Sequence, residues 1–259
     1  MFALADLESS LAGTVFAGNL HFTASTGSTN SDALAAARAG APHGSVFFAD
    51  EQTAGRGRGD HQWLSAPGDG LYVSVLLRPR LPIQRLLLLP LAAGLAAAQA
   101  IRSVSALAVD LRWPNDLLIG PRKAGGILVE ANSENGGVVY AVVGIGINVH
   151  QRHFPPHLDT PATSLDLAAG HTVSRQALLI ALLESLQNEA LALLDPAAAL
   201  AIPERVEQTS TWVRGRQVSV HGPQACQGVT AGLDQDGFLL VSTGGGQVRV
   251  QTGGLRAAS

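Results

Sequence analysis

The chain has 259 residues, of which 46% are hydrophobic and 14% charged, a composition typical of a compact globular protein and not of a disordered one. Its formal net charge of -3 gives no general attraction for nucleic acid, so any anion site must come from a local cluster of cations. The single cysteine, Cys226, excludes an internal disulfide, and no Cys/His spacing resembles a zinc site, which fits a reducing compartment.

The N-terminal stretch MFALADLESSL is acidic and has no basic region, so it does not resemble a secretory signal. The longest uncharged apolar run, Leu86 to Ile101, is shorter than the roughly 20 residues that cross a bilayer, and it predicts a buried helix. We therefore expect a cytoplasmic protein that binds neither a membrane nor nucleic acid.

In the first half of the chain, predicted helices alternate with predicted strands. STGSTNSDALAAARAG indicates a loop passing into a helix, which Asn30 or Ser31 caps and Gly40 ends. The apolar runs that follow predict strands over Ser45–Asp50 and Leu71–Arg78 and a helix over Leu86–Val104. Pro90 is compatible with that helix only in or near its first turn.

The middle of the chain predicts hairpins. VDLRWPNDLLIG and KAGGILVEAN are expected to pair through a turn at Gly120 and Pro121, and VVYAVVGIGINVH predicts a long apolar strand ending at Asn148. Residues Gln151–Gly170 are proline-rich and predict a mobile loop, and Ser174–Leu194 predicts an amphipathic helix. Hairpins mixed with helices indicate an α+β fold, a mixed and mostly antiparallel sheet layered with helices.

From about Thr211 the pattern changes to short strands separated by glycine turns. Asp236-Gly237 is the clearest hairpin signal in the chain. This segment predicts a small C-terminal β-barrel. We expect two domains, with residues 1–208 forming the larger one and residues 209–259 the barrel.

Four stretches carry more polar groups than packing requires: Ser28-Thr29-Asn30, Gln52–Trp63, Trp113-Pro114-Asn115-Asp116 and Lys123-Ala124-Gly125-Gly126. The first is interpreted either as helix caps or as a site for a polar head group, since both use the free N–H groups of a helix N-terminus. In the third, an Asx-turn would explain the Asn and Asp side chains. In the fourth, the two glycines leave the lysine ammonium open to a ligand.

The segment GRGRGDHQW, Gly55 to Trp63, concentrates glycine and arginine. It is interpreted either as a solvated surface turn or as an anion-binding loop; a single tract within apolar sequence disfavours a disordered RNA-binding segment. Arg56 and Arg58 on an extended segment would point to one face and match phosphate or carboxylate oxygens. The glycines would let this loop stay flexible until it folds over an anion.

The sequence does not match the P-loop or dinucleotide-binding motifs. A P-loop needs a lysine followed by Ser or Thr after its last glycine, but here Gly59 is followed by Asp60. GIGINV lacks the third glycine of the dinucleotide motif.

Taken together and in this order, STN, QTAGRGRG followed by a tryptophan, WPND, KAGGILVE and GIGINV resemble the biotin protein ligases. The similarity covers about Ser25 to Val149 by motif, and ATSL at 162–165 and the β-rich C-terminus extend it. The resemblance implies a class II synthetase-like catalytic domain that uses biotin, ATP and Mg²⁺. Biotin and MgATP would give biotinyl-5'-AMP and pyrophosphate, and the biotinyl group would then pass to a lysine of a biotin carboxyl carrier protein, the acetyl-CoA carboxylase subunit.

The resemblance also implies site residues. Those for biotin are Ser28, Thr29, Asn30, Gln52, Arg56, Gly57, Arg58, Lys123, Gly125 and Gly126. Those for ATP and the adenylate are Arg56, Arg58, Trp63, Asn115, Lys123 and Asn148. Arg56, Arg58 and Lys123 are the expected catalytic residues, because they would neutralise the biotin carboxylate and the α-phosphate, two anions that repel each other. No metal ligand is assigned.

Two departures from the family pattern are visible. Gly59, Asp60 and His61 stand where relatives carry further arginines, so the sequence does not determine the conformation of the closed loop. Asp60 is expected to pair with a loop arginine. Only 27 residues precede Ser28, and we expect a ligase without the DNA-binding domain of some relatives.

Two alternative functions are considered. A lipoate ligase or octanoyl transferase would share the fold, but the transferases use a cysteine near a lysine, and Cys226 lies in the predicted C-terminal domain. A biotin-sensing repressor is disfavoured by the short N-terminus. The sequence does not decide between a monomer and a homodimer.

Overall fold

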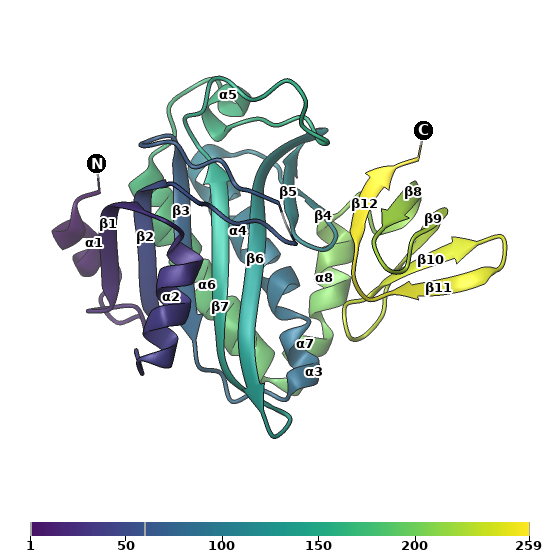
Figure 1. The fold of residues 1–259 in the computed structure, drawn as a ribbon, viewed down its shortest axis with the longest axis horizontal. Coiled ribbons are helices and arrows are strands. Elements are labelled where there is room, and N and C mark those ends of the chain that lie inside the picture. Colours follow the sequence, from purple (N-terminus) through teal and green to yellow (C-terminus); the bar gives the residue numbers. More distant parts are fainter. Residues whose placement is uncertain (1, 60, 259) are drawn as a thin grey trace.

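The computed structural model describes residues 2–59 and 61–258, which form a large mixed sheet layered with helices and a smaller antiparallel sheet (Figure 1). The strands of the large sheet are β1 (Leu20–Thr26), β2 (Ser45–Gln52), β3 (Gly70–Leu77), β4 (Asp110–Arg112), β5 (Asp116–Ile119), β6 (Arg122–Glu134) and β7 (Gly137–Asn148). They are ordered β1-β2-β3-β7-β6-β5-β4, and only the β1–β2 pair is parallel. The mixed, mostly antiparallel α+β fold predicted from the sequence is confirmed.

Helices cover both faces of this sheet. They are α1 (Leu4–Ser10), α2 (Thr29–Arg38), α3 (Ile83–Leu86), α4 (Leu89–Ser105), α5 (Leu165–Ala169), α6 (Arg175–Leu194), α7 (Pro196–Leu200) and α8 (Ile202–Thr209). Helix α2 packs on one face over β2, β3 and β7, and α4 and α6 pack together on the other (Figure 1). Every residue of β3 is buried as a result, which is why GLYVSVLL is a nearly continuous apolar run.

Two helices differ in their limits from the sequence prediction. Helix α2 begins at Thr29 with Ser28 as its N-cap, two or three residues earlier than expected. The reason is a distant partner: the side chain of Gln52 accepts the hydrogen bond of the Thr29 backbone N–H. The predicted helix over 86–104 is divided into α3 and α4, with Pro90 in the first turn of α4 as expected.

Two helical stretches, Ile83–Ser105 and Arg175–Leu194, are long and apolar enough to cross a membrane when judged by length and composition alone. The first is longer than the uncharged run considered above. Both contribute to the core, where side chains such as Ala96, Leu182 and Leu186 are fully buried. This burial is what the core helix of a folded domain requires.

The predicted strand VDLRWPNDLLIG is interrupted. It forms β4 and β5, which pair with each other across a turn at 113–115, and β5 then pairs with β6 as expected. Pro114 lies in that turn, and a proline has no N–H to continue a ladder. Asn115 makes no Asx-turn bond of its own: its side chain donates to Ile127 O at 2.8 Å and so fixes the turn against β6.

The smaller sheet comprises β8 (Arg214–His221), β9 (Cys226–Leu233), β10 (Leu239–Thr243), β11 (Gly246–Val250) and β12 (Gly254–Ala257). Its order is β11-β10-β9-β8-β12, and all of its pairs are antiparallel. Gly237 in the β9–β10 turn has φ +82°, as its hairpin signal predicted. The buried Trp113 indole donates to Gly237 O at 3.0 Å, and this contact joins the small sheet to the β4–β5 turn.

Candidate active site

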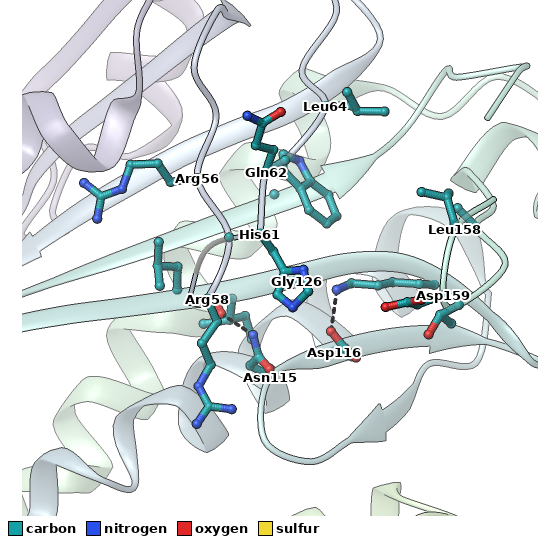
Figure 2. A pocket seen from close by; sticks show the side chains of 18 of the residues that line it. Arg56, Arg58, His61, Gln62, Leu64, Asn115, Asp116, Gly126, Leu158 and Asp159 are labelled. Atoms are coloured by element: carbon teal, nitrogen blue, oxygen red, sulfur yellow. Dashed lines mark hydrogen bonds and ion pairs between the residues drawn. The ribbon is translucent and has the colours of Figure 1, made fainter. Parts of the chain in front are cut away.

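A cavity of about 1350 Å³ lies where the two sheets meet (Figure 2). Its lining comes from the N-terminus of α2, from β6 and β7, from the β4–β5 turn, from residues 151–162 and from β8 and β12 of the small sheet. The remaining wall is the arginine loop, residues 52–65. Of the residues that the sequence assigns to the site, all but Gln52 and Gly125 line this cavity.

The arginine loop is ordered as a hairpin. Bridges join Gln52 to Ser65 and Arg56 to Gln62, the Trp63 N–H donates to Gly55 O at 2.9 Å, and the Gly57 N–H donates to His61 O at 2.7 Å. A Cβ on Gly55 would lie 2.3 Å from Trp63 O, so glycine is needed for the two sides to approach. Asp60, expected to pair with an arginine, lies outside the described residues.

The two arginines of the loop bind in different places, although an extended segment would have placed them on one face. Arg56 donates to Ser31 Oγ at 3.2 Å and pairs with the Glu130 carboxylate. Arg58 donates to Thr252 Oγ1 and to Gly253 O in the β11–β12 connection. Figure 2 shows the two guanidinium groups pointing apart. The expectation fails because Arg56 lies in the bridged part of the loop, whereas Arg58 lies beyond the last bridge, in a bend.

Lys123 lies on the floor of the cavity in an ion cluster. Its Nζ is 2.6 Å from Asp116 Oδ1, and Arg112 approaches Asp116 Oδ2 at 2.6 Å. Burial by itself would raise the pKa of Asp116, but Lys123 and Arg112 outweigh burial and hold the pKa below its ordinary value. Asp116 is therefore ionised at neutral pH. Sequence reasoning assigned Asp116 only to a turn and omitted Arg112, because the strand pairing that brings these residues together was not known.

Two glycines of β7 make room for site residues. A Cβ on Gly144 would lie 2.0 Å from Asn30 Oδ1, and a Cβ on Gly146 would lie 2.5 Å from Trp63 Nε1. Residues i and i+2 of a strand face the same side, so one GxG pair admits both neighbours. The motif GIGINV thus shapes the cavity floor and is not a dinucleotide fingerprint.

The end of the cavity beside α2 is built on buried hydroxyl and amide groups. The backbone N–H and the hydroxyl of Thr29 both donate to Gln52 Oε1, at 2.9 and 3.1 Å, and Gln52 Nε2 donates to Ser65 Oγ at 2.8 Å. Ser74 Oγ lies 2.8 Å from Thr29 Oγ1 and 2.6 Å from Asn30 Oδ1. Ser74 was missed by sequence reasoning, and its only signal is that it is the single serine in the interior of a largely apolar strand.

Asn148 and Trp63 contact the cavity from the end of β7 and from the arginine loop. The Asn148 amide donates to Thr163 O at 3.0 Å and ties residues 151–163 to the end of β7. The Trp63 ring centroid lies 5.5 Å from Lys123 Nζ. Within residues 2–59 and 61–258, no group of three or more His, Cys, Asp and Glu side chains is arranged to hold a metal ion.

Residues 22–148 match the Biotin/lipoate A/B protein ligase family. The Biotin--[acetyl-CoA-carboxylase] ligase of Mycobacterium tuberculosis is 35% identical over 240 residues, which cover 90% of this chain and 87% of that relative. The chain is a member of the biotin protein ligase family.

Two further proteins are similar to this chain, one in sequence and one in structure. Bifunctional ligase/repressor BirA of Bacillus subtilis is 43% identical over 150 residues, so the match spans 57% of this chain but only about half, 46%, of that relative. The structure described as "Biotin protein ligase from Aquifex aeolicus in complex with biotin and ATP" superposes with a TM-score of 0.79 at 29% identity, covering 93% of this chain and 100% of that one.

Proposed function

We propose that the chain is an ATP-dependent biotin protein ligase. It converts biotin and ATP to biotinyl-5'-AMP and pyrophosphate, and then transfers the biotinyl group to a lysine of a carboxyl carrier domain. The observation that carries this proposal is the convergence of Arg56, Arg58 and Lys123 on one cavity with the N-terminus of α2 and an indole wall. The relatives named above are ligases of biotin, and the family membership supports the same chemistry here.

In the first step a carboxylate oxygen of biotin attacks the α-phosphorus of ATP. An oxygen–phosphorus bond forms, the bond to the β-phosphate breaks, and pyrophosphate leaves with the electron pair. Both reacting groups are anions, so their approach requires fixed positive charge in a site from which water is excluded. Lys123, held by Asp116, supplies a charge on the floor, and Arg56 and Arg58 supply charge from the loop. Magnesium enters with the phosphates of the nucleotide, as part of the substrate.

The biotin head group would bind at the N-terminus of α2. Ser28 lines the cavity, and its hydroxyl makes no capping hydrogen bond to the described part of α2, so it faces this end as a donor or acceptor. Thr29 lies beside it. Gln52 supports Thr29 from behind, and Gly125 keeps β6 close to β7, since a Cβ there would lie 2.9 Å from Gly146 O. Gln52 and Gly125 thus shape the pocket without lining it.

The nucleotide would occupy the end lined by Trp63, Asn115 and Asn148. In the second step the amine of the acceptor lysine attacks the carbonyl of the mixed anhydride, and AMP leaves. No nucleophile of the protein is needed in either step. The arginine loop covers the cavity and would protect the adenylate from water.

The finer features of the function are proposals as well. The acceptor is a biotin carboxyl carrier protein of acetyl-CoA carboxylase, the enzyme for which the Mycobacterium tuberculosis relative is named, and the reaction takes place in the cytoplasm. The catalytic unit comprises residues 1–208, and residues 209–259 form the small β domain that closes one side of the cavity. Either a monomer or a homodimer is compatible with a cavity built from one chain.

The test is a reaction of the purified chain with a carrier domain, ATP and either biotin or lipoate, followed by mass spectrometry of the carrier. Biotin should give one covalent biotinyl group together with AMP and pyrophosphate. Modification by lipoate alone, or no nucleotide-dependent modification, would refute the proposal. An octanoyl transferase is disfavoured because Cys226 lies on β9, outside the residues that line the cavity, and burial raises the pKa of its thiol.

A further inference from the structure

Glu130, on β6 beside the biotin end of the cavity, uses both of its carboxylate oxygens. Oε1 pairs with the guanidinium of Arg56, and Oε2 accepts from Asn30 Nδ2 at 3.0 Å. One side chain of the sheet therefore holds both the arginine loop and the first turn of α2. Sequence reasoning did not assign Glu130, since it follows an apolar strand and has no polar neighbour in the motif KAGGILVE.

The bond to Asn30 fixes the orientation of that amide. Asn30 Nδ2 donates to Glu130 and to Leu128 O at 3.3 Å, so Asn30 Oδ1 is left to accept from Ser74. Ser74 in turn contacts Thr29, whose N–H and hydroxyl donate to Gln52. A continuous hydrogen-bond network thus connects Arg56 through Glu130 to the base of the same loop.

The bond to Arg56 leaves part of the guanidinium available. Nη2 donates to Glu130 and Nη1 to Ser31 Oγ, while a guanidinium carries five N–H donors in a planar fork. Its orientation is therefore set at one edge, and its other donors can reach a ligand. The side chains of Arg56 and Glu130 are 41% and 27% exposed, and an ion pair this exposed adds little to the stability of a fold. Placement of the guanidinium is the effect that remains.

We propose that Glu130 is a positioning residue for biotin. Its carboxylate aligns Arg56 from the loop with Asn30 and Thr29 from α2, so that the three converge on one end of the cavity before biotin arrives. This proposal rests on the proposed function. It predicts that loss of the carboxylate weakens the capture of biotin more than it slows the reaction of bound substrates.

The test compares Glu130→Gln with the wild-type chain in pyrophosphate release, with biotin varied at saturating ATP. The KM for biotin should rise on the order of tenfold while kcat falls by a smaller factor, because Glu130 serves binding through Arg56 and Asn30 but affects the transition state only through Arg56. Glu130→Asp should recover part of the loss. Glu134→Gln, at an exposed position of the same strand, is the matched control, and its KM should equal that of the wild type. Thermal denaturation checks that each variant is folded.

A double-mutant cycle distinguishes positioning from a general structural effect. If Glu130 acts through Arg56 as well as Asn30, adding Glu130→Gln to an Arg56→Gln chain should raise the KM by a smaller factor than in the wild-type chain, because only the contact to Asn30 is left to lose. Multiplicative effects would overturn the proposal. So would an unchanged KM in Glu130→Gln, and so would a lowered one, which would mean that the carboxylate competes with substrate for Arg56.

Isothermal titration with biotin alone separates this proposal from the proposed function. A chain that binds biotin but does not consume ATP would refute the ligase activity. The affinity ratio between wild type and Glu130→Gln would still decide whether Glu130 positions the biotin site.

Discussion

Gly146→Ala should impair use of ATP far more than it impairs the fold. The new Cβ would lie 2.5 Å from Trp63 Nε1 and 2.7 Å from Trp63 Cε2, whereas ordinary contacts are about 3.5 Å. The indole must therefore move by about 1 Å. On the other side of the ring lies Gly126 of β6, where an added Cβ would be in ordinary contact with Trp63 Cζ3 at 3.5 Å. Trp63 and Gly146 both line the cavity, so the displacement disturbs its wall at the proposed nucleotide site.

The effect of the substitution on folding and its effect on catalysis differ in size. Forcing one extra methyl against a packed ring costs about 1 to 3 kcal/mol of folding free energy, which lowers the melting temperature by about 2 to 12 °C in a chain of this length. A misplacement of about 1 Å in an active site reduces rates on the order of 100-fold. We therefore expect kcat/KM for ATP to fall about 100-fold in a variant that remains folded.

The assay is pyrophosphate release with ATP varied at saturating biotin, together with thermal denaturation. Gly137→Ala is the matched control, since it lies on the same strand and its Cβ would meet nothing closer than Glu134 O at 3.7 Å. An unchanged kcat/KM for ATP in Gly146→Ala would refute the placement of Trp63 at the nucleotide. Equal losses in both variants would point to a general intolerance of β7 to alanine.

Three other predictions concern charges around the cavity. Lys123→Ala should lower the rate of pyrophosphate release by at least tenfold, since a lost charge-assisted contact in a transition state costs about 2 to 4 kcal/mol, and an unchanged rate would exclude its assigned role. Because the pKa of Asp116 is held below its ordinary value, its ion cluster should stabilise the fold above about pH 4 and lose that effect as the pH falls further. Denaturation between neutral and acid pH measures this, and Asp116→Asn should lose that part of the acid dependence. Arg58→Gly removes the contacts to Thr252 and Gly253, so biotinyl-5'-AMP should escape and label lysines of a bystander protein; full retention of the intermediate would count against a covering loop.

Most of the fold follows from local patterns. Alternating and continuous apolar runs located β2, β3 and β7, and proline in the first turn located α4. The errors arise where a distant group replaces a local one. The start of α2 was placed too late because Gln52, 23 residues away, takes the role of a cap. An Asx-turn was considered at Asn115, but the pairing of β4 with β5 was not predicted, because closure of that turn depends on a hydrogen bond from the Asn115 amide to β6.

The residues of the candidate site also fall into two groups: those that local motifs predict and those that depend on distant partners. Motifs dense in glycine and arginine identify residues that line the cavity, because such residues have no use in a core. The residues that hold them are ordinary acids and hydroxyls with remote partners: Asn30 and Ser74 are 44 residues apart, and Arg56 and Glu130 are 74. No spacing rule predicts these pairs. They become visible only when the order of β3, β7 and β6 is known.

The divergence of Arg56 and Arg58 gives the arginine loop two separate supports. Arg56 is fixed by Glu130 of the large sheet, whereas the partners of Arg58 lie 194 and 195 residues further along the chain, in the β11–β12 connection of the small sheet. Because the supports are independent, capture of biotin and retention of the adenylate should respond to different substitutions. Changes at Glu130 should alter the first, and changes at Thr252 should alter the second. The small sheet is then part of the catalytic cycle through the loop it holds, even though no residue of the predicted site lies on it.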